Sequence, residues 1–212
     1  MLSVDLIERH FRAGHLDQLL HGLSANGLDL PLALRIRLSQ HPACSLALAL
    51  RRLTELAYGP TSLSRTMTSR LLDMQDSDGS FASDPLATAC ALAAFGQAQA
   101  EPQHLVDPEI GPARQRALAA LAAMQADDGL MSHPCDRTWQ QRAMVSAFIL
   151  HLLAHDAEFR GTIRLAEMMD WFEQHQDQLE PETEQDWLMA RLDAGGSAPP
   201  GPLSPAYAAI AA

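Results

Sequence analysis

Lysine is absent from this chain of 212 residues, so its 15 basic side chains are all arginines. A chain without lysine cannot form a Schiff base with a carbonyl substrate, which excludes that class of enzyme. The 26 acidic side chains outnumber these cations and give a net charge of −11. Nucleic acids and anionic membranes require a positive protein face, so we expect neither as the main partner.

Long apolar runs and a recognisable export signal are also missing. The two longest apolar stretches, 86–95 and 143–154, are shorter than the roughly 18 to 20 residues that a membrane-spanning helix needs. Asp5 and Glu8 stand where an export signal would carry positive charge. The three cysteines are far apart and odd in number, which suits a reducing compartment. We therefore expect a cytoplasmic protein with no transmembrane segment.

The residues that dominate the sequence are good helix formers. Alanine, leucine, glutamine, arginine and methionine are abundant, β-branched residues are few, and no convincing alternation of apolar and polar residues predicts a strand. With 47% hydrophobic residues, the chain can bury a core. We predict an all-α fold, with one helical repeat domain over residues 1–194. The tail over residues 195–212 is rich in proline, glycine and alanine.

An eleven-residue pattern occurs twice, at 71–81 (LLDMQDSDGSF) and 121–131 (LAAMQADDGLM). A fixed period of this kind is typical of repeat proteins. Weaker copies stand near Gly27 and near Gln176, so we count about four repeats of about 51 residues. The residues shared by the two clear copies are Leu71 and Leu121, Met74 and Met124, Gln75 and Gln125, Asp78 and Asp128, and Gly79 and Gly129.

Each clear copy predicts the end of a helix. The leucine and methionine fall on one face of a helix, and the helix is expected to end at the glutamine. The following glycine, Gly79 or Gly129, can adopt the left-handed conformation that stops a helix. Phe81 or Met131 can then fold back onto the helix, and the amides of Gln75 and Gln125 can bond helix ends in their own or the neighbouring repeat.

This pattern resembles the QW-type repeat of terpenoid cyclases and protein prenyltransferases. Gln75, Gly79 and Phe81 fit the pattern, and Gln125 and Gly129 fit it with a methionine in the place of the aromatic residue. The resemblance covers residues 60 to 178 and implies an α/α-toroid, a double ring of helical hairpins around an apolar cavity. About four hairpins make an incomplete ring, which a second copy of the chain, another protein or the chain's own terminal segments would complete.

The sequence departs from these enzymes in the residues that carry their chemistry. The acidic DxDD motif with which such cyclases protonate their substrates is absent. Prenyltransferases bind zinc, and the residues to weigh for a zinc or acid/base site are His133, Cys135, His151 and His155, with Asp136 beside them. His151 and His155 are four residues apart, which would place both imidazoles on one helix face. Ordinary structural histidines are the alternative.

Arginine pairs could bind the diphosphate of an isoprenoid substrate. Arg137 and Arg142 are the pair to watch, because they flank the start of the most apolar helix. Salt bridges on solvated helix faces are the alternative explanation of these pairs.

Two functions remain open from the sequence. The first is an accessory or binding module that holds an apolar ligand, a peptide or a partner protein on a concave face, without cofactor. The second is a small enzyme of isoprenoid or specialised metabolism that uses the histidine and cysteine residues named above. The absent acid motif and an aromatic content of only 5% favour the binding module.

Overall fold

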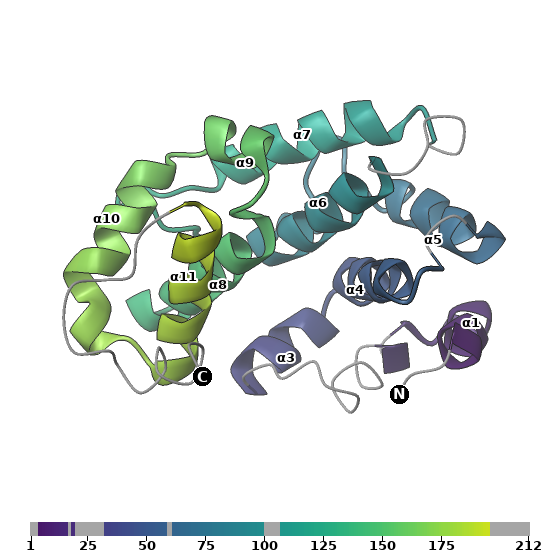
Figure 1. Ribbon diagram of the computed structural model, residues 1–212, viewed down its shortest axis with the longest axis horizontal. Coiled ribbons are helices and arrows are strands. Elements are labelled where there is room, and N and C mark those ends of the chain that lie inside the picture. The colour runs from purple at the N-terminus through teal and green to yellow at the C-terminus, as the bar shows by residue number, and fades with distance from the viewer. Residues whose placement is uncertain (1–3, 17, 20–31, 59–60, 100–106, 196–212) are drawn as a thin grey trace. The chain divides into compact units, whose positions relative to one another are not determined.

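The computed structural model describes residues 4–16, 18–19, 32–58, 61–99 and 107–195. All regular elements in these ranges are helices, which confirms the predicted all-α class (Figure 1). None of the helices in the described ranges is long and apolar enough to cross a membrane. The weak repeat copy at Gly27 and the tail beyond residue 195 lie outside the described residues.

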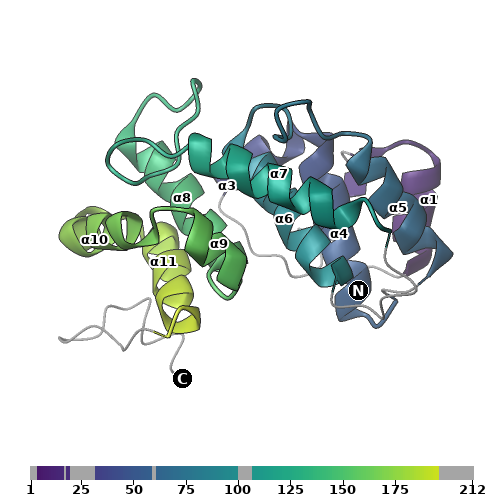
Figure 2. The same cartoon turned by 90° about the horizontal axis from the view of Figure 1, so that it is seen from above.

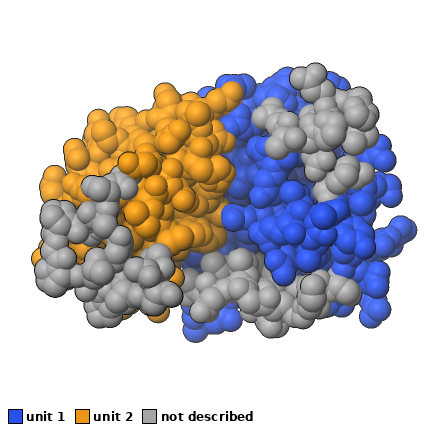
Figure 3. All heavy atoms as spheres, in the orientation of Figure 1, with its two compact units in different colours: residues 1–120 blue, residues 121–212 orange. Residues whose placement is uncertain are grey.

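The chain divides into two compact units, residues 1–120 and residues 121–212 (Figure 3). The boundary falls within one helix. The helices of the first unit are α1 (Val4–Arg12), α3 (Leu32–Ser39), α4 (Pro42–Glu55), α5 (Ser62–Leu72), α6 (Pro85–Gln99) and most of α7 (Ile110–Ala123). The second unit contains α8 (Trp139–Leu153), α9 (Ala157–Thr162), α10 (Leu165–His175), the 3-10 helix η2 (Gln176–Gln178) and α11 (Pro181–Asp193).

One helix pair forms the centre of each unit. In the first unit α4 packs against α6, and also contacts α3 and α5 (Figure 1). In the second unit α8 packs against α11 (Figures 1 and 2). Most side chains of α4, α6 and α8 between the helix ends are buried, whereas α11 buries Thr183, Trp187, Leu188 and Ala190. Burial of apolar surface is the main stabilising contribution to such a core.

The start of α6 shows how the sequence sets a helix boundary. Asp84 precedes Pro85, and its Oδ1 accepts hydrogen bonds from the backbone N–H groups of Leu86 and Ala87, at 2.8 and 2.9 Å. Its Oδ2 accepts a bond from Arg37 of α3 at 2.8 Å. Burial alone would raise the pKa of Asp84, but the hydrogen bond and charge of Arg37, with help from the Ala87 N–H, hold it below the ordinary value.

Both repeat copies form the same local structure, which we call the first helix-stop turn (residues 75–81) and the second helix-stop turn (residues 125–131). In the first, the N–H of Asp76 bonds the carbonyl of Ser80 at 2.9 Å; in the second, the N–H of Ala126 bonds the carbonyl of Leu130 at 2.8 Å. The helices end at Leu72 and Ala123, earlier than the sequence predicts, so each glutamine lies beyond its helix. Met74 and Met124 continue the apolar stripe past the helix end, which explains the difference.

The two glycines of these turns have the left-handed backbone that the sequence predicts, with φ of 89° at Gly79 and 83° at Gly129. The last residue of each turn, Phe81 or Met131, is buried, and its backbone N–H donates a hydrogen bond to a hydroxyl of the following helix. Phe81 donates to Thr88 of α6 at 3.1 Å, and Met131 donates to Ser146 of α8 at 2.9 Å.

Each helix-stop turn is bonded to the beginning of the next repeat through its glutamine. The Gln75 amide donates to the carbonyls of Gly79 and of Ala113 in α7, at 2.9 and 2.8 Å. The Gln125 amide donates to the carbonyls of Gly129 and of Arg164 at the start of α10, at 2.6 and 3.2 Å. The Gln125 Oε1 also accepts the Arg164 N–H at 2.8 Å. The glutamines therefore join consecutive repeats.

Candidate functional site

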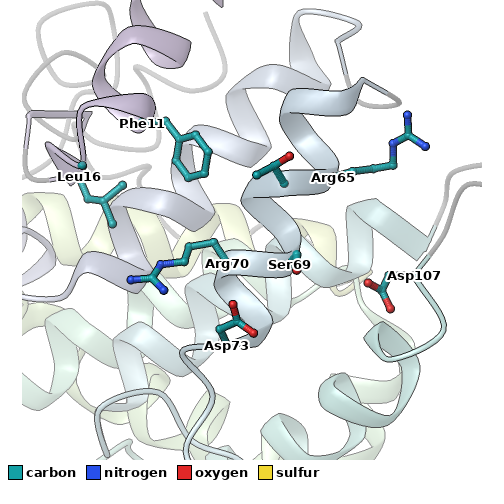
Figure 4. Close-up of a pocket in the computed structure, with 9 residues that line it drawn as sticks. Phe11, Leu16, Arg65, Ser69, Arg70, Asp73 and Asp107 are labelled. Carbon is teal, nitrogen blue, oxygen red and sulfur yellow. The ribbon is translucent and has the colours of Figure 1, made fainter.

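A pocket of about 670 Å³ lies between α1 and α5 in the first unit (Figure 4). One side is formed by the end of α1 and the residues after it, Phe11, Gly14 and Leu16. The other side is the outer face of α5, with Asp107 nearby. Its volume is in the range of about 300 to 1,000 Å³ that is usual for small-molecule sites, and the pocket is an open hollow rather than an enclosed cavity. The α5 residues that line it are Arg65, Thr66, Ser69, Arg70 and Asp73.

The lining of this pocket contains apolar, cationic, anionic and hydroxyl groups together. Phe11 and Leu16 lie opposite the helix, and the side chains of Arg65 and Arg70 extend from it in different directions (Figure 4). Both arginines are exposed, and neither has an ion pair or side-chain hydrogen bond within the described part of the chain. Two guanidinium groups and the carboxylates of Asp73 and Asp107 therefore line the same pocket, and the guanidinium groups have no partner among the described residues.

The structure does not bring the predicted metal or acid/base residues together. Helix α8 ends at Leu153, so His155 lies beyond the helix that carries His151, and a shared site for the two imidazoles stays a prediction. His133 Nδ1 accepts the backbone N–H of Cys135 at 3.2 Å, and the Cys135 side chain is exposed and free. Among the described residues, no three histidine, cysteine or acidic side chains lie close enough to hold a metal ion.

The predicted arginine pair is divided between two environments. Arg142 forms a salt bridge with Asp128 of the second helix-stop turn, so an acidic side chain of the second unit compensates its charge. Arg137 is exposed, and its backbone N–H bonds Gln141 at 2.8 Å. Anion binding by Arg137 stays a prediction.

A pair of titratable side chains that the sequence did not indicate as a pair joins the two central helices of the second unit. His151 of α8 and Asp186 of α11 face each other, with 4.0 Å between Nδ1 and Oδ1. The His151 ring stacks on Phe148, with ring centroids 6.5 Å apart. Burial raises the pKa of Asp186 to about 7, because the charged carboxylate loses its hydration there. The buried neighbours Trp187 and Leu188 are the sequence signal that could have placed Asp186 near the core.

Comparison of the chain with protein-family models, with curated proteins and with solved structures finds no match in any of the three. The resemblance to terpenoid cyclases and prenyltransferases therefore stays a prediction from the repeat pattern.

Proposed function

We propose that this protein is a non-catalytic binding module, built from the α-helical repeats, that holds its ligand in the pocket between α1 and α5. The observation that supports this function is the pocket itself, which combines an apolar side with two arginines that have no partner among the described residues. Binding sites commonly pair an apolar wall with a few polar groups that fix orientation. A toroid-like arrangement of the repeats and a cytoplasmic location belong to the same proposal, the latter because Cys44, Cys90 and Cys135 are all free.

The lining of the pocket changes the kind of ligand that we expect from the sequence. Phe11 and Leu16 can contact an apolar group, as expected for an apolar ligand or a peptide. Arg65 and Arg70 add a requirement for oxygen acceptors, and the hydroxyls of Thr66 and Ser69 can donate or accept hydrogen bonds. A ligand with both an apolar part and exposed oxygen atoms therefore fits better than a hydrocarbon.

Native mass spectrometry of the full chain as purified tests this function. Ser69→Trp would place a large side chain in the pocket from an exposed position on α5, whereas Gln174→Trp makes the same kind of change on the exposed surface of α10. We expect a retained molecule on the wild type and on Gln174→Trp, and its loss from Ser69→Trp. A molecule that all three proteins retain equally would place the ligand elsewhere, and the proposed site would be wrong.

A small enzyme is the second candidate, and the pair of His151 and Asp186 favours it. A carboxyl group that titrates near pH 7 beside an imidazole is a suitable acid/base pair. The test is a screen of isoprenoid diphosphates and simple esters with wild type, Asp186→Asn and His151→Gln. An activity that both variants lose would support the enzyme, and an activity that survives both would exclude this pair.

A further inference from the structure

Three aromatic rings of the second unit, carried by α8 and α10, form a half-buried cluster (Figure 1). Trp139 begins α8, and Trp171 and His175 lie one turn apart on α10. The ring centroids of Trp139 and Trp171 are 5.8 Å apart. Those of Trp171 and His175 are 4.2 Å apart, with the two rings nearly parallel. We call these three residues the aromatic cluster.

The core of the second unit supports the aromatic cluster from behind. Phe172 is buried, meets Trp171 edge-on with 5.3 Å between centroids, and stacks on buried Trp187 at 5.9 Å. The Nδ1 atom of His175 donates to the carbonyl oxygen of Trp171 at 2.8 Å, which fixes the orientation of the imidazole. Rings that are already held in place lose little conformational entropy when a ligand packs against them. The cluster is therefore a preorganised surface with a large apolar contact area.

The described chain ends close to α10. Arg191, in the last turn of α11, forms a salt bridge with Glu173 of α10, with 3.1 Å between Nη2 and Oε1. Glu173 belongs to the stretch of α10 that carries the cluster, and Gly195 is the last described residue. At about 3.1 Å per residue, residues 196–212 would span about 50 Å if extended. A helix is only about 10 Å wide, so the tail can reach the cluster from the end of α11.

The sequence of the tail suits a surface of aromatic rings. Pro199, Pro202 and Pro205 are three residues apart, which is the period of a polyproline II helix, so this spacing predicts three prolines along one side. Proline-rich segments of this kind dock on grooves lined by aromatic side chains, and their preformed shape lowers the entropy cost of binding. Residues 196–212 contain no charged side chain, so the acidic side chains exposed on α10 do not repel the segment.

We infer that the aromatic cluster is the docking site of the chain's own tail, with Pro202 and Pro205 against the rings of Trp139 and Trp171. A tethered segment has an effective concentration on the order of 1 mM, so a free segment of equal affinity displaces it only at such concentrations. The tail therefore occupies the cluster ahead of a second copy or another protein. The cluster lies in the second unit and the pocket of α1 and α5 in the first, so this inference does not depend on the function proposed above.

A fluorescent peptide with the sequence of residues 197–207, SAPPGPLSPAY, is the probe for this inference. Its binding to the full chain is measured by fluorescence anisotropy. The double variant Pro202→Ala, Pro205→Ala should bind the peptide about tenfold or more tightly than the wild type does, because its own tail no longer competes. Pro200→Ala, which changes a proline outside the three-residue period, should bind the peptide as weakly as the wild type does.

The same double variant shows where the peptide binds. Trp139→Ala, added to it, should weaken peptide binding at least tenfold, whereas Gln185→Ala, on the exposed surface of α11, should leave binding unchanged. Thermal unfolding of each variant checks that it is folded.

Photocrosslinking locates the tail without any change to the helices. Benzoylphenylalanine in place of Tyr207 should form crosslinks within one chain to residues 139–144 or 168–175, which mass spectrometry of the digested protein identifies. These crosslinks should be lost when Pro202→Ala and Pro205→Ala are added.

Equal binding of the peptide to the wild type and to the double variant would overturn the inference, because the tail would then not occupy the cluster. Absence of binding to both, or crosslinks confined to other parts of the chain, would overturn it as well. A covalent dimer as the main crosslinked product would assign the contact to the tail of a second copy and reject docking within one chain.

Discussion

Substitution of Gly79 by alanine tests the contact between consecutive repeats most directly. The new Cβ atom would lie 2.5 Å from the backbone oxygen of Arg116 and 2.7 Å from its carbonyl carbon, and backbone atoms cannot move aside as the end of a side chain can. The residue would also have to keep a φ of 89°. Both effects destabilise only the folded state.

The two contributions can be estimated separately. A left-handed backbone costs a non-glycine residue about 1–2 kcal/mol. An overpacked contact adds about 1–3 kcal/mol. We therefore expect Gly79→Ala to lower the free energy of unfolding by about 2–5 kcal/mol, a large part of the roughly 5–15 kcal/mol that stabilises a typical domain.

Gly14→Ala is the matched control for the backbone contribution. Gly14 has a φ of 73° and belongs to the same unit, but a Cβ atom there meets nothing within 4 Å. It should cost only the about 1–2 kcal/mol of the left-handed backbone. Gly161→Ala, within α9 and also free of contacts, should change stability little or raise it by up to about 1 kcal/mol.

Urea unfolding followed by far-ultraviolet circular dichroism measures these differences in the full chain. Gly79 and Gly14 belong to the same unit, so their effects are compared on the same transition. A loss for Gly79→Ala within about 0.5 kcal/mol of that for Gly14→Ala would refute the close contact with α7, since effects of that size are ordinary for surface changes.

Three further changes test the polar contacts. Gln125→Ala removes the bonds to Gly129 and Arg164 and should cost about 1–3 kcal/mol in urea unfolding, whereas Gln140→Ala on exposed α8 surface should cost less than about 0.5 kcal/mol. Asp84→Ala leaves Arg37 without its buried partner and should cost about 3–5 kcal/mol at pH 7. The pKa of Asp84 is lowered in the folded state, so its carboxylate stabilises the fold above the unfolded pKa, and this stabilisation is lost as pH falls through the folded pKa. The stability of Asp84→Ala should therefore differ least from that of the wild type in acid. The pH dependence that Asp186 causes has the opposite sign. Because its pKa is raised in the folded state, its contribution to the free energy of unfolding is complete below its ordinary pKa of 3.8 and is lost as pH rises through about 7. The difference of about three pKa units corresponds to at most about 4 kcal/mol. Asp186→Asn should remove this dependence and be more stable than wild type at pH 8, and an unchanged slope of stability against pH between 5 and 8 would contradict the raised pKa.

The fold class and the local structure of the repeats were predictable because short-range physics determines them. The alanine and leucine content predicts helices, and the shared glycines predict the left-handed residues at 79 and 129. Helix ends were less predictable. The apolar stripe continues through Met74 although the helix stops at Leu72, and a periodic pattern cannot show where the backbone leaves the helix.

The candidate sites depended on contacts that the sequence does not contain. The pocket joins Phe11 and Leu16 to α5, about fifty residues away, and none of its residues forms a local motif. Asp186 is one acid among several on α11, and only packing against α8 distinguishes it from Glu182 and Glu184. His151 and His155 were grouped by a spacing that assumes a continuous helix, and α8 ends between them.

The joints between repeats depend largely on backbone atoms. The Gln75 and Gln125 amides both bond carbonyl oxygens, and Gly79 and Gly129 both lie against main-chain atoms of the next repeat. A joint of this kind tolerates changes in the side chains around it, so neighbouring repeats can diverge in sequence while the connection persists. Removal of residues 76–125 would place Ala126 directly after Gln75 and keep glutamine and glycine four residues apart. The fifty-residue segment is thus a natural unit for duplication or loss of a whole repeat, with the joint itself preserved.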